Sequence, residues 1–201
     1  MHVNLGLQLT QRAGLSTNLE AYVEPSTDTR LTFSELNKLS NRYADVMAGL
    51  NLQPGDRIAL LTQNCVEFLW LFYGAAKLGL VVLPLNTRLT PSELSFILDD
   101  SATKALFYGS ECGELAQGIK TIEEHELCIE TWMQVHPGTG ADDNLAAMLE
   151  SASDAEPKVT HGGDDNLFIM YTSGTTVLPK GVVHTHDTIT WAALSWVTSM
   201  D

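Results

Sequence analysis

The chain has 201 residues, of which 44% are hydrophobic and 18% charged, and its 25 acidic and 11 basic side chains give a net charge of −14. This composition is typical of a globular protein and excludes an intrinsically disordered chain. The acidic balance argues against a broad basic surface for a nucleic acid, but not against a small polyphosphate, since local N–H groups and one lysine act within the Debye length of about 8 Å.

The cysteines and the N-terminus predict a cytoplasmic protein. The three cysteines lie far apart without CxxC spacing, which favours unreactive thiols over a disulfide framework. Residues 1–10 lack the basic and apolar regions of a signal peptide. The most apolar stretch, residues 68–85, is interrupted by Lys77, Pro84 and two glycines. We therefore expect a buried helix followed by a strand, and no membrane span.

Residues 1–30 contain few strong signals and predict only a short helix and loops. Residues 32–50 predict an amphipathic helix. Thr32 and Glu35 form a candidate capping box, in which each side chain bonds the backbone N–H of the other residue. Apolar residues follow at three- and four-residue steps, which is the spacing of one helical face.

Strands and helices are predicted to alternate over the next part of the chain. Residues 58–62 and 80–85 predict short apolar strands. The helix between them is predicted to begin at Asn64, to be buried, and to end at Gly79.

A further helix is predicted over residues 90–100, because Thr90 is a good N-cap, Pro91 fits the first helical position and Glu93 is the third. Residues 104–108 predict the next strand. This alternation is typical of right-handed βαβ units on a parallel sheet, so the predicted fold class is α/β.

Residues 136–165 predict an acidic linker between two subdomains. Acidic residues are frequent there, Lys158 is the only base, and a short helix is predicted over residues 144–151 with solvated loops on both sides. An alternative is a binding tail. We therefore expect an N-terminal α/β subdomain over residues 1–160 and the start of a second α/β subdomain over residues 161–201.

The loop that begins at Thr172 carries the clearest chemical signal. It follows an apolar strand over residues 167–171, surrounds Gly174 with four hydroxyl side chains and leads to Lys180. Glycine can adopt positive φ, which lets successive N–H groups converge on a phosphate oxygen, and the lysine can add a charge-assisted hydrogen bond. The spacing differs from that of a Walker A motif. From these residues alone, a plain turn remains an alternative.

Residues 171–182, YTSGTTVLPKGV, closely resemble the phosphate-loop signature of the acyl-adenylate-forming ligases, the AMP-binding superfamily that includes acyl-CoA synthetases. The resemblance continues upstream in residues 31–36, 54–59 and 74–86. Residues 86–90, NTRLT, are more similar to fatty- or aryl-acid CoA ligases than to peptide-synthetase domains.

This resemblance implies a two-step reaction with ATP, Mg²⁺ and coenzyme A. A carboxylic acid attacks the α-phosphate of ATP to give acyl-AMP and pyrophosphate, and coenzyme A then takes the acyl group. The loop would stabilise the leaving pyrophosphate. By motif position, the phosphate-binding residues implied are Thr172, Ser173, Gly174, Thr175, Thr176 and Lys180.

The chain departs from the family pattern in two ways. Val177 stands where the family has glycine, and a β-branched residue disfavours positive φ, so either the loop takes another path or phosphate binding is weaker. No segment up to Asp201 matches the family's adenine pocket, magnesium ligand or catalytic lysine. We therefore expect an N-terminal fragment that is inactive alone, and assign it no catalytic residue and no metal ligand. The alternatives are a non-catalytic ATP- or pyrophosphate-binding module and an interaction fragment without ligand.

Two pairs of residues near the C-terminus have other interpretations. His184 and His186 suggest a metal site, but without a third ligand a simple strand-end pair is favoured. Trp191 and Trp196 are expected to be core residues whose partners lie outside this chain. Left exposed, they would favour a homo-oligomer or a domain-swapped assembly.

Overall fold

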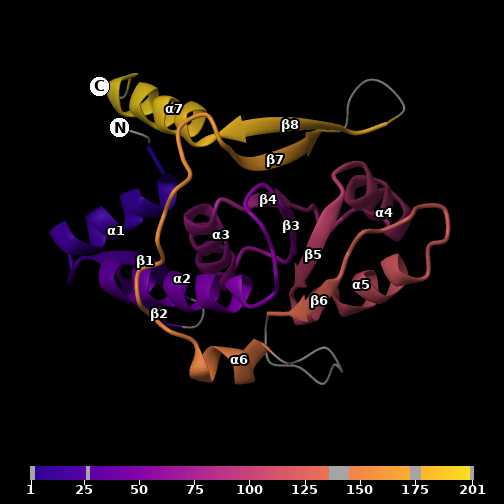
Figure 1. The fold of residues 1–201 in the computed structure, drawn as a ribbon, viewed down its shortest axis with the longest axis horizontal. Helices are drawn as coiled ribbons and strands as arrows, with labels where there is room; N and C mark the ends of the chain where they lie inside the picture. The colour runs from indigo at the N-terminus through magenta and orange to yellow at the C-terminus, as the bar shows by residue number, and fades with distance from the viewer. Residues whose placement is uncertain (1–2, 26–27, 136–144, 173–177, 200–201) are drawn as a thin grey trace.

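A computed structural model describes residues 3–25, 28–135, 145–172 and 178–199 (Figure 1). Its centre is a six-stranded sheet in the order β6-β5-β3-β4-β7-β8. The first five strands in this order are parallel, and β8 is antiparallel to β7. The predicted α/β class with a parallel sheet is therefore confirmed. The strands are β3 (Arg57–Leu61), β4 (Val81–Pro84), β5 (Thr103–Tyr108), β6 (Thr131–Gln134), β7 (Asn166–Thr172) and β8 (Lys180–Thr185).

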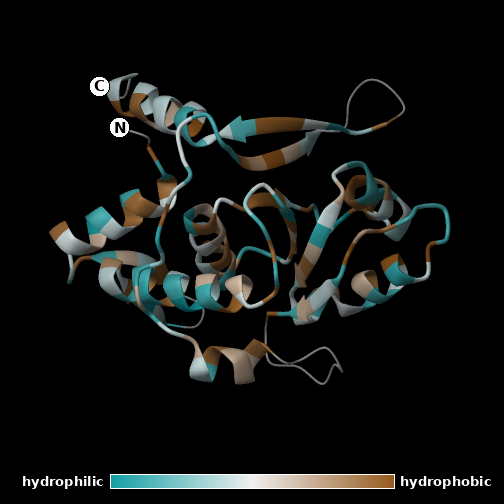
Figure 2. Ribbon diagram, in the orientation of Figure 1, coloured by the Kyte–Doolittle hydropathy of each residue, from teal (hydrophilic) through white to brown (hydrophobic). Residues whose placement is uncertain are grey.

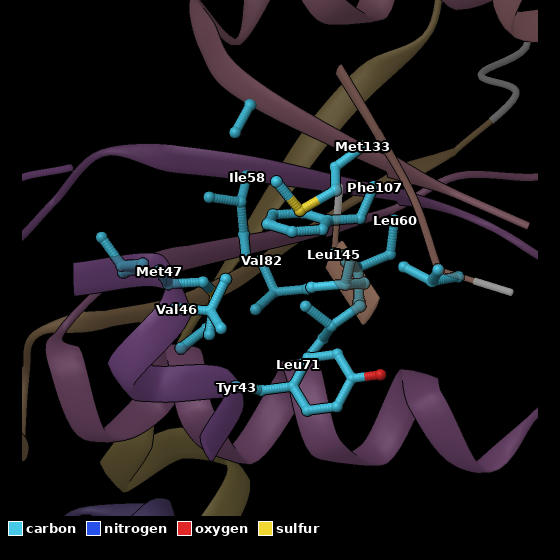
Figure 3. Close-up of a cluster of buried hydrophobic side chains, with 14 residues drawn as sticks. Tyr43, Val46, Met47, Ile58, Leu60, Leu71, Val82, Phe107, Met133 and Leu145 are labelled. Atoms are coloured by element: carbon cyan, nitrogen blue, oxygen red, sulfur yellow. The ribbon is translucent and has the colours of Figure 1, made fainter. Parts of the chain in front are cut away.

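Helices cover both faces of this sheet. Along β3, Ile58 and Leu60 enter a core shared with α2, α3 and α6 (Figure 3), whereas Ala59 and Leu61 enter a core shared with α4 and α5. The strand is buried on both faces, as is usual for a parallel sheet. Within the described ranges, no helix is long and apolar enough to cross a membrane. The helices are α1 (Leu5–Leu15), α2 (Phe33–Ala48), α3 (Val66–Leu78), α4 (Pro91–Asp100), α5 (Gly113–Lys120), α6 (Leu145–Ser151) and α7 (His186–Ser199), with one 3₁₀ turn, η1 (Ser110–Cys112).

The capping box expected at Thr32 is present, and a second one forms at Thr90, where the sequence predicted a cap and a helix start. The backbone N–H of Thr32 donates to Glu35 Oε2 over 2.8 Å, and that of Glu35 donates to Thr32 Oγ1 over 3.2 Å. Thr90 and Glu93 repeat this arrangement at the start of α4. These hydrogen bonds lower the pKa of both glutamates.

The predicted start of α3 is wrong by one residue. Cys65, not Asn64, is the N-cap, and its side chain makes no capping hydrogen bond, so the polar signal of Asn64 is not used there. The predicted end at Gly79 is confirmed. Gly79 adopts the left-handed conformation with φ of 72°, and the ring of His161 lies 2.6 Å from where a Cβ at this position would be.

Residues 1–30 contain more structure than we expected. Besides α1, they contribute β1 (Glu20–Glu24), which pairs antiparallel with β2 (Thr29–Thr32) in a separate two-stranded sheet. Both strands are short and half-exposed, so they show no alternation of apolar and polar residues strong enough to predict them.

The segment after α6 is mostly exposed, and hydrogen bonds tie it to the helices. Its anchor is a fully buried lysine, Lys77, whose ammonium donates to Asn37 Oδ1 over 2.7 Å, to Asn41 Oδ1 over 2.6 Å, and to Glu156 Oε1 over 2.8 Å. An ammonium has three N–H groups, so each has an acceptor. The predicted solvated loop after α6 is thus exposed at most positions, and Glu156 anchors it at this point.

Between Glu156 and β7, the same connection contacts the residues that precede α1. Asn4 Nδ2 donates to the carbonyl of His161 over 2.8 Å, and Gly163 N donates to the carbonyl of Val3 over 2.7 Å. As Figure 1 shows, the start of α1 lies beside α7, where Leu5 N donates to His186 Nδ1 over 3.1 Å. Contacts far apart in sequence thus hold the base of the β7–β8 hairpin.

Candidate functional site

The candidate site lies at the carboxyl edge of the sheet. Because β3, β4 and β7 are parallel, their last residues, Leu61, Pro84 and Thr172, lie toward the same edge. The chain order reverses between β3 and β4, since β4 lies on one side of β3 and β5 lies on the other. Ligands of open α/β sheets bind in the crevice at such a switch point.

A polar cavity of about 560 Å³ is present at this switch point. Small-molecule sites usually have volumes of about 300–1,000 Å³, so the cavity has the size of a ligand site. Its lining comes from the two segments that directly follow β3 and β4: Thr62, Gln63, Asn64, Leu85, Asn86, Thr87 and Arg88.

Both signs of charge are available at this crevice. The carboxylate of Glu111 accepts from Gln63 N over 2.9 Å and from Thr62 Oγ1 over 3.1 Å. Arg88 is exposed, and its guanidinium makes no hydrogen bond or ion pair with any residue that the structure describes. A guanidinium presents a planar set of donors that suits carboxylate and phosphate groups. Arg88 is therefore available to an anionic ligand.

The predicted phosphate loop joins β7 to β8 at the same edge. Thr172 and Lys180 are opposite each other in the antiparallel pairing, and both are exposed. The Lys180 ammonium has no hydrogen-bond or ion-pair partner within the described ranges. Ser173, Gly174, Thr175, Thr176 and Val177 lie outside the described residues. The phosphate-binding assignment of the six residues therefore stays a prediction. The structure describes two of them, Thr172 and Lys180, at the two ends of the loop.

A tyrosine supports the first end of this loop. The hydroxyl of Tyr171 donates to Asp100 Oδ2 over 2.5 Å, which joins the end of β7 to the end of α4. Burial, and then the neighbouring Asp100 carboxylate, raise the pKa of Tyr171. The phenol therefore stays protonated and keeps this hydrogen bond across the physiological range.

The two histidines after the loop have different environments. The ring of His184 stacks on Phe168, with 4.6 Å between centroids. His186 is buried, and its Nδ1 accepts the hydrogen bond from Leu5 N. In the part of the chain that the structure describes, no three His, Cys, Asp or Glu side chains form a group that could hold a metal ion. His184 lies in β8 whereas His186 begins α7, so the two rings do not share one strand face.

Sequence reasoning identified the loop but missed the cavity residues. A usable signal was present, because polar triplets, residues 62–64 and 86–88, follow two apolar strand predictions. Nothing in the sequence alone placed β4 and β5 on opposite sides of β3. That strand order brings the two polar triplets together in the lining of one cavity.

Comparison with known proteins decides the family. The model of the AMP-binding enzyme family matches residues 9–201. This chain belongs to that family. Among relatives, it is 52% identical over 198 residues to the long-chain-fatty-acid–CoA ligase FadD13 of Mycobacterium tuberculosis, covering 98% of this chain and 38% of the relative. The resemblance seen in residues 171–182 is therefore confirmed.

Solved structures of the AMP-binding family show the same fold. The inhibitor-bound N-terminal domain of FACL13 from Mycobacterium tuberculosis has a TM-score of 0.91 at 50% identity, covering 99% of this chain and 48% of that one. ATP-bound MatB from Rhodopseudomonas palustris has a TM-score of 0.83 at 30% identity, covering 98% of this chain and 38% of that one. The chain thus spans 38–48% of the length of these proteins.

Proposed function

We propose that this chain supplies the ATP-phosphate-binding part of an AMP-forming ligase. The ligase would activate a carboxylic acid, fatty or aryl, to acyl-AMP and then to acyl-CoA. The observation that carries the proposal is the pairing of Thr172 with Lys180 at the edge of the sheet that also holds the switch-point cavity. Membership of the AMP-binding family and the name of FadD13 support it.

In this proposal the loop acts on the leaving group. A carboxylate oxygen attacks the α-phosphorus of ATP, the bond to the bridging oxygen breaks, and pyrophosphate leaves with added negative charge. Lys180 would bind the β- and γ-phosphates together with the hydroxyl and N–H groups of residues 172–176, and so stabilise that charge. Mg²⁺ would neutralise further phosphate charge. The thiol of coenzyme A then displaces AMP from the acyl group.

The cavity offers a second place for anionic substrate groups. Arg88 lies in its lining and has no described partner, whereas Glu111 disfavours a ligand that is anionic throughout. We therefore assign the cavity to a polar part of ATP or coenzyme A, with Arg88 binding a phosphate. The apolar part of the acid is not expected there, because Leu85 is the only aliphatic side chain among the described residues of the lining.

Titration of the ¹⁵N-labelled chain with Mg-ATP and with Mg-pyrophosphate tests this function. We expect amide shifts at Thr172 and Lys180, and binding weakened about 10–100-fold in Lys180→Met, because a charge-assisted hydrogen bond contributes about 1.5–3 kcal/mol. Lys38→Met removes an exposed lysine on α2 and is the matched control. If both ligands leave the loop amides unshifted, the chain is an interaction fragment without ligand.

We also propose a cytoplasmic location. Its support is the set of three free cysteines, Cys65, Cys112 and Cys128, which fit a reducing compartment. A free thiol count after isolation without reductant tests it, since any disulfide formed in the cell would contradict the assignment.

A further inference from the structure

The side chain of Tyr171 contacts both strands that flank the phosphate loop. Tyr171 is opposite Gly181 in the antiparallel pairing of β7 with β8. A Cβ added at Gly181 would lie 3.1 Å from Cζ of Tyr171 and 3.2 Å from its Cε2, so the tyrosine ring crosses over this glycine. Gly181 does not adopt positive φ. The space that the ring occupies, rather than an unusual backbone conformation, is therefore what suits glycine to this position.

The hydroxyl of Tyr171 ties the same point to a helix outside the hairpin. It donates to Asp100 at the end of α4, and Figure 1 shows the end of β7 near this helix. In turn, Arg57 of β3 donates through Nε to the carbonyl of Ser101 over 2.6 Å and through Nη2 to that of Ala102 over 2.8 Å. The backbone that follows Asp100 is thus held by the centre of the sheet.

The end of the hairpin has few other polar links to the rest of the protein. The pairing of β7 with its inner neighbour β4 is described at one position, Val82–Phe168, and the later residues of β7 pair with β8. Figure 2 shows hydrophobic residues along the middle of both strands. Within the described ranges, no other side chain of β7 or β8 forms a hydrogen bond with a residue that precedes β7. The hydrogen bond of Tyr171 therefore has a large part in setting where the end of β7 lies.

The position of Tyr171 also sets that of the next residue pair. Thr172 and Lys180 are opposite each other one step further along the hairpin. Consecutive side chains of a strand point to opposite faces, so these two point away from the face that carries the tyrosine ring. Lysine has a long and flexible side chain, and a backbone held in one place reduces the freedom that is lost when its ammonium binds a phosphate.

We propose that Tyr171 is a positioning residue for phosphate binding. Its ring covers Gly181 of β8 and its hydroxyl binds Asp100, so one side chain holds both strands against α4. This arrangement keeps Thr172 and Lys180 where they bind the β- and γ-phosphates of ATP. The inference rests on the proposed function, and it gives Tyr171 no contact with the reacting atoms.

Calorimetry with Mg-pyrophosphate tests this role in Tyr171→Phe, which keeps the ring over Gly181 and removes the hydroxyl. We expect binding to be about 3–10-fold weaker, because the site loses part of its preorganisation but none of its phosphate ligands. Tyr22→Phe is the matched control. It removes a hydroxyl that also donates to a carboxylate, Glu24 Oε2 over 3.2 Å, but on the separate β1–β2 hairpin, and should leave the affinity unchanged.

Asp100 provides a test that separates positioning from a general loss of stability. Asp100→Asn keeps an acceptor oxygen for the phenol and should retain the affinity, whereas Asp100→Ala should weaken binding as much as Tyr171→Phe does. Both changes remove the same hydrogen bond, so the double variant should bind no more weakly than either single variant. Circular dichroism verifies that each variant is folded.

The ring contact has its own test in Gly181→Ala. The added methyl would lie 2.9 Å from Cγ2 of Ile169 and 3.1 Å from Cζ of Tyr171, so it should displace the ring and weaken Mg-pyrophosphate binding. In the ligand-free chain, the amide resonances of Thr172 and Lys180 should shift in Gly181→Ala and in Tyr171→Phe, but not in Tyr22→Phe.

The outcomes separate this inference from the proposed function. If the unsubstituted chain binds Mg-pyrophosphate and Tyr171→Phe binds it equally well, the positioning role is overturned while the phosphate-binding proposal stands. Additive losses in the double variant with Asp100→Ala have the same consequence. If the unsubstituted chain does not bind Mg-pyrophosphate, the proposed function fails and this inference fails with it.

Discussion

The ammonium of Lys77 lies 2.8 Å from a carboxylate oxygen of Glu156, and the lysine side chain is fully buried. Glu156 also accepts from Thr10 Oγ1 over 2.6 Å and from Asn41 Nδ2 over 3.0 Å. One pair of charges therefore joins α1, α2, α3 and the connection that leads to β7. Burial lowers the pKa of Lys77, although its hydrogen bond to Glu156 opposes this effect.

The substitution Glu156→Gln should strongly destabilise the fold. It leaves the Lys77 ammonium buried without its counter-charge, and breaking one side of a buried pair costs about 3–5 kcal/mol, here near the lower limit because Glu156 is partly exposed. Urea unfolding measures the change. The exposed pair Arg30–Glu20 is the control, and Arg30→Gln should cost less than about 1 kcal/mol. Equal losses in the two variants would show that the buried pair has no special role.

Acid should weaken the fold through His186. Burial lowers the pKa of this imidazole below its ordinary value of 6.5, although Asp165 and Asp187 oppose the shift. Below the ordinary pKa the unfolded chain therefore binds more protons than the folded chain. The contribution of His186 to stability is complete above about pH 6.5 and is lost as the pH falls toward the folded-state pKa. Melting temperatures measured from about pH 7.5 down to about pH 5.5, a range that spans the ordinary histidine pKa of about 6.5, report this loss of stability.

The variant His186→Asn should flatten this pH dependence, because asparagine keeps an acceptor near Leu5 N but does not titrate. His125→Asn removes a histidine at the side of Asp99, far along the chain from this contact, and serves as the control. An unchanged pH profile in His186→Asn would assign the acid sensitivity to other groups.

The substitution Val177→Gly should tighten phosphate binding. Glycine restores the residue that the family has at this position and permits positive φ without a Cβ clash. We expect Mg-ATP to bind about 5–30-fold more tightly, as measured by calorimetry, because positive φ costs a residue with a Cβ roughly 1–2 kcal/mol. Val23→Gly, on the separate hairpin, should leave the affinity unchanged. A weaker affinity in Val177→Gly would show that the loop takes a path suited to valine.

The chain alone should not catalyse adenylation. It spans 38% of the length of FadD13, so most of the length of this relative has no counterpart in it. ATP–pyrophosphate exchange with labelled pyrophosphate and a panel of fatty and aryl acids should therefore give no signal above buffer. Exchange above that background would require a reaction centre within these 201 residues.

Features set by neighbouring residues were predictable from the sequence. Each capping box joins residues three positions apart, so the Thr32–Glu35 and Thr90–Glu93 pairs could be predicted without knowledge of the tertiary fold. The parallel sheet was predictable because each apolar strand alternates with a helix signal. The start of α3 was not, since Asn64 is a better cap by residue type than Cys65, which occupies the N-cap.

Features that depend on distant partners were not predictable. Lys77 looked like an interruption of an apolar stretch, and only the fold places Glu156 beside it. The switch-point cavity requires the order of β3, β4 and β5, which no local pattern encodes. For the phosphate loop, the resemblance to the family gave the assignment of its residues, and the structure gives the positions of Thr172 and Lys180 at its two ends. The boundary between subdomains at residues 160 and 161 stays a proposal, which limited proteolysis would test.

Two independent constraints, one steric and one on the backbone, disfavour any residue other than glycine at position 79. A side chain there would meet the ring of His161, and it would also require an L-residue to adopt φ of 72°. Shortening His161 would relieve the first problem but leave the backbone cost of about 1–2 kcal/mol. One compensating substitution therefore cannot relieve both constraints, and we expect glycine to be retained at this position.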